Sequence, residues 1–117
     1  MIELDIKNFI DDNLDYPAYM ELPSNPPDTF YIIEKVGGSQ DEHIDSATVA
    51  IQTYASSMYQ AASLAESLID SMLNDFVLLS NISKVELNSS YNYPDTRVKK
   101  YRYQSLFDIY YYGGSST

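Results

Sequence analysis

The chain has 117 residues, no cysteine and a net charge of −10, so we expect one domain with neither disulfides nor thiolate metal sites. An acidic chain releases no counterions from a nucleic-acid backbone, and sequence-independent DNA or RNA binding is therefore not expected of the whole protein. No apolar run reaches the length of a membrane span, and the first residues lack the layout of a signal peptide, which predicts a protein of the cytosol with no membrane contact.

The first predicted element is a short helix over residues 2–14, where apolar residues recur at three- and four-residue spacing. A loop over residues 22–28 follows, because its three prolines fix φ and withhold backbone donors. A short extra strand near residues 16–22 fits between them. Residues 29–36 and 44–54 are rich in β-branched and aromatic residues, and together they predict a hairpin.

The turn between those two strands contains glycine and polar residues only, so we expect a mobile tip. It consists of Gly37, Gly38, Ser39, Gln40, Asp41, Glu42 and His43. Together with Asp45, the turn offers three carboxylates and the single imidazole of the chain, which raises the hypothesis of a metal or acid–base site. A solvated tip is the better interpretation, because a mobile loop does not hold ligands firmly and no second histidine or cysteine completes the set.

The apolar period changes to that of a helix after Ser57, which forms a capping-box pattern with Gln60. This pattern predicts the longest helix, over residues 57–76. A second hairpin follows, with strands at residues 82–91 and 98–112 around a turn that contains a proline.

These elements predict an α+β fold class, a small mixed β-sheet built from two hairpins and packed against one long helix and a short N-terminal helix. We expect a single domain over residues 1–112. Residues 113–117 are glycine and small polar residues with nothing to pack, and they predict a flexible C-terminal tail.

Alternation along the last predicted strand separates its side chains into two faces. The core face would hold Tyr101, Tyr103, Ser105, Phe107, Ile109 and Tyr111, and the polar face Lys100, Arg102, Gln104 and Asp108. Seven of the chain's twelve tyrosines lie in this hairpin beside four basic residues, a combination also found in platforms for single-stranded nucleic acid. Because the alternation places most of these rings with Phe107 and Ile109, core packing and protein–protein contact are favoured.

The sequence carries no local pattern of a catalytic or nucleotide-binding site. A serine triad would need His43 as its base, yet no Gly-x-Ser-x-Gly elbow is present. The segment Gly37-Gly38-Ser39 lacks the spacing and the lysine of a phosphate loop. We therefore predict a protein that is not an enzyme, with no catalytic, cofactor-binding or metal-binding residues and no cofactor.

Several segments in a fixed order carry a resemblance that covers nearly all of residues 29–112 and is weak before them. The first are Tyr31 to Gly38, His43-Ile44, Ala47 to Ala55 and Met58 to Ala62, and the last are Tyr91-Asn92-Tyr93-Pro94-Asp95-Thr96 and Lys100-Tyr101-Arg102-Tyr103-Gln104. With these segments the chain resembles a family of phage and prophage minor tail or head–tail joining proteins of Gram-positive hosts.

The resemblance implies a tail-terminator-like fold and a structural role. Such a tail terminator, or tail completion protein, forms a six-fold ring at the head-proximal end of the tail. Its partners are further copies of itself, the tail tube protein and head-completion or neck proteins, and DNA passes through without specific binding. It belongs to the virion and is made in the cytoplasm of the bacterial host. A head-completion, neck or other minor tail role is the alternative, and a small enzyme or ligand-binding module is the hypothesis from another class.

The distribution of charge suggests where subunits of such a ring meet. Residues 1–54 hold eleven acids against two lysines, whereas residues 80–117 hold five bases against three acids. We expect acidic surface of the first segment to contact a basic strand face that stays exposed in the monomer. The residues of that contact are Lys99, Lys100, Arg102, Tyr103 and Gln104. The tip from Gly37 to His43 would face the lumen or the tube.

Overall fold

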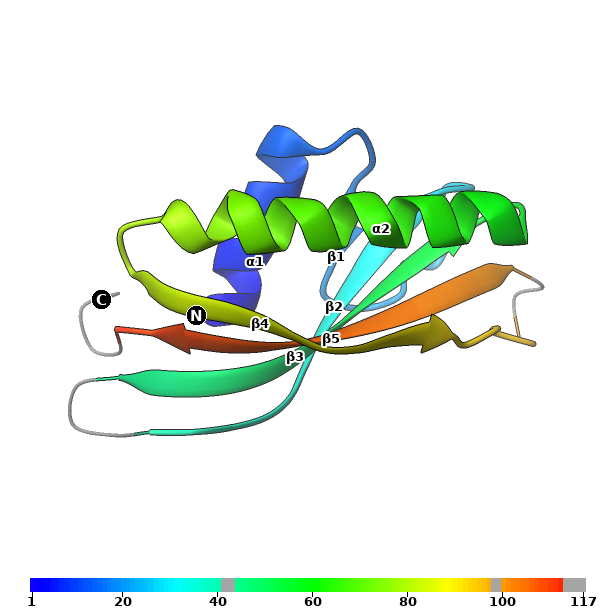
Figure 1. Cartoon of the computed structure of the whole chain (residues 1–117). Coiled ribbons are helices and arrows are strands. Elements are labelled where there is room, and N and C mark those ends of the chain that lie inside the picture. The colour runs from blue at the N-terminus through cyan, green and yellow to red at the C-terminus, as the bar shows by residue number, and fades with distance from the viewer. Residues whose placement is uncertain (41–43, 98–99, 113–117) are drawn as a thin grey trace.

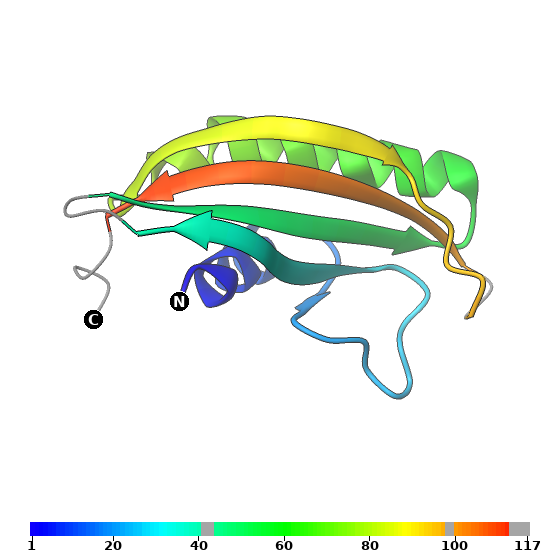
Figure 2. The same cartoon turned by 90° about the horizontal axis from the view of Figure 1, so that it is seen from below.

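The computed structural model describes residues 1–40, 44–97 and 100–112. They form two α-helices, a short 3-10 helix and one five-stranded mixed sheet, which confirms the predicted α+β class. Both α-helices lie on the same face of the sheet (Figure 1). Seen from below, the other face is bare of helices over the described chain (Figure 2).

The two helices form where apolar spacing predicts them. Helix α1 (Ile2–Asn13) buries one apolar stripe, and helix α2 (Met58–Asn74) buries a second that begins with small residues. The hydroxyl oxygen of Ser57 accepts a hydrogen bond from the Gln60 backbone N–H at 3.2 Å, which caps the start of α2 as the sequence indicated. A short 3-10 helix, η1 (Phe76–Leu78), follows α2 directly.

The sheet combines the two predicted hairpins with a small extra strand. The strands are β1 (Ala18–Tyr19), β2 (Phe30–Ser39), β3 (Asp45–Ala55), β4 (Ile82–Asn92) and β5 (Tyr101–Tyr111). Their order is β1-β2-β3-β5-β4, with β1 parallel to β2 and every other neighbour antiparallel. The two hairpins therefore join through β3 and β5 at the centre of the sheet.

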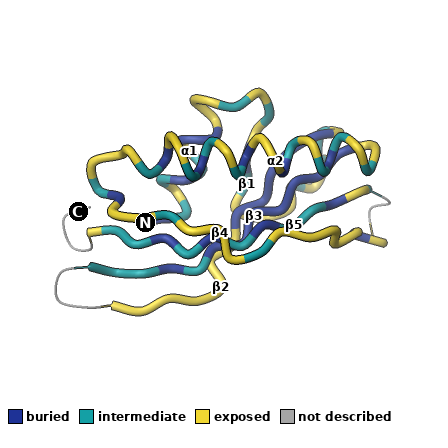
Figure 3. The backbone as a smooth tube through the Cα atoms, in the orientation of Figure 1, coloured by how far each residue is buried: buried dark blue, intermediate teal, exposed yellow. Residues whose placement is uncertain are grey.

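The main core lies between the sheet and the helices. Helix α2 packs over β3, β5 and β4, and helix α1 packs over β1 and β2. Small side chains at Ala61 and Ala65 let α2 approach the sheet closely, and both are buried. The rings of Phe9 and Phe76 meet edge to face at 5.4 Å between centroids, which connects the two helical segments. Figure 3 shows that buried backbone concentrates where the helices face the sheet.

Two sequence expectations about burial and strand length are wrong. Tyr101 was expected on the core face, yet it is 44% exposed because it lies at the start of β5, beyond the buried centre of the sheet. The mobile tip was expected to begin at Gly37, yet β2 continues to Ser39. A register shift between Lys35 and Gly37 accommodates one extra residue, and the strand then resumes its pairing with β3.

Of the remaining residues of that tip, only Gln40 lies within the described ranges. Gln40 follows β2 and is exposed. Asp41, Glu42 and His43 lie outside the described residues, as does the tail over 113–117. The expected mobility of the tip and of the tail therefore stays a prediction.

Gly38 and Gly37 provide a matched test of this strand extension. Gly38 has φ +155°, and a Cβ there would lie 2.4 Å from the Ser46 carbonyl oxygen, whereas a Cβ on Gly37 would find only the Thr48 Cβ at 3.9 Å. We expect Gly38→Ala to lower the free energy of unfolding by about 1–3 kcal/mol and Gly37→Ala to change it by less than about 0.5 kcal/mol. Urea denaturation measures both, and equal effects would contradict the close approach.

Candidate assembly surface

The face of the sheet opposite the helices carries a mixture of aromatic, amide and charged side chains. Strand alternation and the pairing register place these residues on it together. From β2 and β3 they are Phe30, Ile32, Glu34, Thr48, Gln52 and Tyr54, and from β5 and β4 they are Arg102, Gln104, Leu106, Asp108, Lys84, Glu86 and Tyr91. We call this set the bare face. Its chemistry is unlike the apolar face under the helices.

A small second hydrophobic cluster lies on the bare face at the β1 side. The rings of Phe30 and Tyr54 stack with centroids 4.5 Å apart, and Tyr19 meets Phe30 edge to face at 6.0 Å. Ile32 completes the cluster. A surface hollow of about 300 Å³ opens beside it, with Met20 and Leu22 in its wall. The cluster is therefore flanked by exposed apolar side chains.

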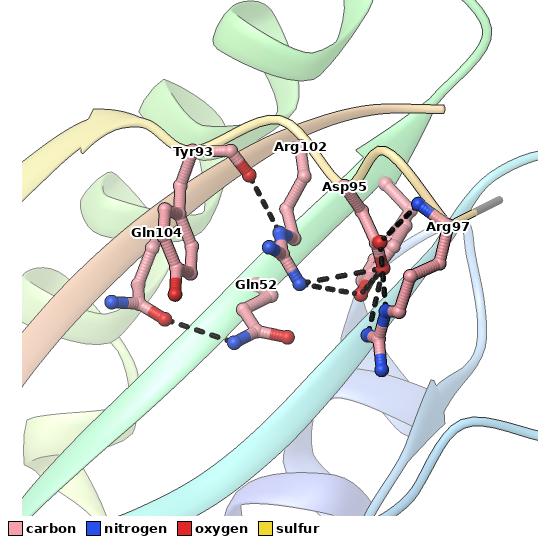
Figure 4. Close-up of polar contacts among 7 residues, drawn as sticks. Gln52, Tyr93, Asp95, Arg97, Arg102 and Gln104 are labelled. Atoms are coloured by element: carbon pink, nitrogen blue, oxygen red, sulfur yellow. Dashed lines mark hydrogen bonds and ion pairs between the residues drawn. The ribbon is translucent and has the colours of Figure 1, made fainter. Parts of the chain in front are cut away.

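Arg102 is the central polar residue of the bare face, and only 8% of it is exposed. Its Nε donates to the Tyr93 carbonyl oxygen at 2.6 Å, and its Nη1 donates to the Tyr54 hydroxyl at 3.0 Å (Figure 4). Nη1 also lies 3.5 Å from Oδ2 of Asp95. The guanidinium carbon stands 4.2 Å from the centre of the Tyr93 ring, a cation–π distance. Arg102 thus ties β5 to β3 and to the turn after β4.

Asp95 holds that turn against the sheet and is 3% exposed. Its carboxylate accepts hydrogen bonds from the Arg97 backbone N–H and from Arg97 Nε and Nη2, each at 3.0 Å. The Tyr54 hydroxyl donates to it at 3.1 Å. These hydrogen bonds, the one from the Arg97 side chain first, lower the pKa of Asp95 to about 2 against the opposing effect of burial. Burial raises the pKa of Tyr54 in spite of the neighbouring guanidinium.

A row of side-chain amides crosses the middle of the bare face. Nε2 of Gln52 donates to Oε1 of Gln104 at 2.9 Å, and Nε2 of Gln104 donates to the Tyr91 hydroxyl at 2.6 Å. Next to it, the Thr48 hydroxyl donates to Asp108 at 2.8 Å. These bonds connect β3, β5 and β4 side by side and fix the orientation of each amide.

The five predicted interface residues do not form one exposed basic face. Arg102 is buried, because the turn held by Asp95 closes over it and Tyr54 packs beside it. Lys100 donates from Nζ to the Asp28 carbonyl oxygen at 3.2 Å, and its side chain is 17% exposed. Gln104 belongs to the amide row, Tyr103 lies half-buried on the helix side of the sheet, and Lys99 lies outside the described residues. The expectation of an exposed face is wrong for Arg102.

Sequence reasoning missed the residues that make this face distinctive. Tyr54 and Gln52 come from a strand far from β5 in sequence, and Asp95 comes from the turn just before β5, yet nothing in the sequence marked them as partners of Arg102 and Gln104. One usable signal is that Gln52 alternates with Val49 and Ile51 along β3, which puts it on the face away from the core.

Within residues 1–40, 44–97 and 100–112, no group of three or more His, Cys, Asp or Glu residues is placed to hold a metal ion. No helix in these ranges is long and apolar enough to cross a membrane. Comparison with protein-family models and with curated proteins gives no match to the sequence.

Replacing Arg102 tests whether its side chain holds β5 against β3 and against the turn after β4. We expect Arg102→Met to lower the free energy of unfolding by about 2–3 kcal/mol, because the Tyr93 carbonyl and the Asp95 carboxylate lose a buried donor. Lys84→Met on the same face is the control, since the Lys84 side chain is 61% exposed, and it should change the value by less than about 0.5 kcal/mol. Urea denaturation followed by circular dichroism measures both. Equal effects would show that Arg102 is merely solvated.

Acid should weaken the same turn. The pKa of Asp95 is about 2 in the folded protein and 3.8 without its partners, so its contribution is complete above about pH 4 and disappears as the pH falls through 2. Because Arg97 is largely exposed, this contribution is about 1–2 kcal/mol. We expect Asp95→Asn to be less stable at neutral pH and to lose less stability between pH 5 and 2. Asp12→Asn, at an exposed position, should keep the wild-type acid profile.

Proposed function

We propose that this protein is a non-catalytic structural subunit of a tailed bacteriophage or prophage, a tail terminator whose copies form a ring at the head-proximal end of the tail. The observation that carries the proposal is a sheet covered by helices on one face only. Its other face is firmly built and rich in aromatic and amide groups, and its outer strand β4 lacks a partner on one side within the described chain. A surface of this kind suits a subunit whose open face and open strand edge are covered by neighbouring subunits.

The exposed aromatic residues support an assembly role. Tyr91 is 41% exposed and Tyr93 is 44% exposed, and their rings meet edge to face at 6.1 Å. Met20 and Leu22 are exposed at the opposite side of the bare face. Tyrosine and methionine are enriched in the buried centre of protein interfaces. Because Gln104 and Arg102 hold the two tyrosines in place, these rings are ready for contact at a low entropic cost.

The charge distribution fits a particle through which DNA moves. Many acids of the first half are exposed, among them Asp11, Asp12, Asp15, Glu21 and Glu34. Carboxylates on the inner surface of a ring would repel the phosphate backbone and keep DNA from binding while it passes. The segments from Tyr31 to Gln104 that resemble tail and head–tail joining proteins point to the same particle.

The test is the size of the purified protein and its affinity for tubes. We expect native mass spectrometry to find a closed ring, and electron microscopy to find that ring at one end of tubes polymerised from the tail tube protein of the same phage. A ring or monomer that binds the head-completion protein and ignores the tubes would favour the neck role instead. A monomer at every concentration that binds neither would contradict the proposal.

A further inference from the structure

The outer edge of β4 offers unused backbone hydrogen-bonding groups. Strand β4 pairs with β5 along its whole length, and no strand in the described ranges pairs with its other side. Such an edge is a template for a further strand. The segment contains no proline that would block pairing.

The direction of the unused groups follows from the register. In an antiparallel pair, residues alternate between bonding to the partner and pointing away from it. The Tyr93 N–H donates to the Arg102 carbonyl oxygen at 2.7 Å, and the Tyr112 N–H donates to the Asn81 carbonyl oxygen at 3.0 Å. Counting inward from the Tyr93 end and from the Tyr112 end, across the two register shifts of β4, assigns the same residues of β4 to the outward set. The N–H and C=O groups of Val85 and Leu87 point away from β5.

The opposite edge of the sheet is also incomplete. Strand β1 pairs with β2 at Tyr31 and Ile32, and a parallel pair at Ile32 uses the outward N–H of Ile33, so β2 lacks a described partner on its outer side from Glu34 onward. The Tyr31 N–H donates to the Pro17 carbonyl oxygen at 2.9 Å, away from β3. The same alternation then points the backbone groups of Lys35, beyond the end of β1, outward. The six residues from Glu34 to Ser39 are all exposed.

The two edges match one another. Along the sheet β2, β3, β5 and β4 alternate in direction, so β2 and β4 run in opposite directions. A second copy placed beside β4 in the same orientation therefore presents its β2 as an antiparallel partner. We propose that β4 of one copy pairs with the free part of β2, residues 34–39, of the next copy, and that the sheet continues from subunit to subunit.

The side chains agree with this contact. Val85 and Leu87 of β4 and Lys35 of β2 all lie on the helix side of the sheet, so pairing their outward groups also keeps the helix layers on one side. Each edge carries one exposed base and one exposed acid, Lys84 with Glu86 on β4 and Lys35 with Glu34 on β2. Neither edge repels the other through net charge.

A contact between copies in the same orientation uses more of the open strand edges than a two-fold contact does. A two-fold contact of β4 with β4 would leave the β2 edge of each copy open. The β4-to-β2 contact uses both edges of every copy and is heterologous, so it closes into a ring when the rotation between copies closes. The inference rests on the proposed ring, and it places the subunit contact at the sheet edges rather than at Lys100 and Arg102.

Cross-linking can identify the contact because the chain has no cysteine of its own. Leu87→Cys and Lys35→Cys would be co-expressed with different tags and treated with a short bis-maleimide. We expect a cross-link between the two variants and none when either is expressed alone. Tyr59→Cys, on α2 at a position 84% exposed, replaces either partner as the control and should give none. Cross-linking of Leu87→Cys with itself would show a two-fold contact and overturn the inference.

A proline variant tests the backbone hydrogen bonds themselves. Leu87→Pro removes an outward N–H that β5 does not use, and a proline is tolerated there on an edge strand. Leu87→Ala shortens the side chain and keeps the N–H. We expect native mass spectrometry to find rings of Leu87→Ala and at least a tenfold loss of rings for Leu87→Pro, with both monomers folded by circular dichroism. If Leu87→Pro misfolds, the cross-links decide. A wild-type ring without the mixed cross-link would overturn the edge contact and leave the ring role standing, whereas wild-type protein that never self-associates would contradict both.

Discussion

The pairing of β3 with β5 is the interaction on which the rest of the fold depends. Each strand belongs to a different hairpin, and they pair from Asp45 with Tyr111 to Ala55 with Tyr101 without a register shift. This uninterrupted ladder makes one sheet out of two hairpins that would each be marginal alone. It also puts Val49, Ile51, Phe107 and Ile109 side by side under α2. The core and the bare face are both consequences of this one alignment.

The same alignment explains why the bare face is stable without a helix to cover it. Tyr54 is opposite Arg102, and Gln52 is opposite Gln104, so polar groups that would otherwise be buried alone find partners across the strands. Asp95 then closes the turn over the guanidinium. A buried arginine is tolerated here because a carboxylate, a hydroxyl and a carbonyl oxygen share its charge and its donors.

These contacts within the subunit change which groups of the bare face are available to a partner. The buried guanidinium of Arg102 does not attract another subunit, and Lys100 already donates a hydrogen bond to Asp28. The surfaces that remain are the exposed rings of Tyr91 and Tyr93, the apolar residues Met20 and Leu22, and the two incomplete strand edges. Backbone pairing at an edge gives geometry and direction, whereas aromatic side chains give buried area. A structural subunit can use both.

The sequence by itself determined the elements of this protein, because periodicity and turn chemistry are local. The apolar stripe from Ala61 to Met72 predicted α2, the Ser57–Gln60 pattern predicted its cap, and the β-branched runs predicted both hairpins and hence the α+β class. Local signals also placed Phe107 and Ile109 in the core. Alternation along β5 assigned its residues to the two faces of the sheet as the register has them, although Tyr101 at the start of the strand is exposed.

Only the tertiary structure decided what each face contains and which edges stay open. The sequence predicted Arg102 at the surface, because alternation along β5 does not show that Asp95 covers its guanidinium or that Tyr54 of β3 lies beside it. The strand order is likewise invisible in a single sequence, since β3 and β5 are joined by no short connection. Strand length near Gly38 depended on a register shift and on the approach of the Ser46 carbonyl. Each of these depends on how the chain folds back on itself, across one turn for Asp95 and Ser46 and between hairpins for Tyr54, and the periodicity along one strand carries no information about such contacts.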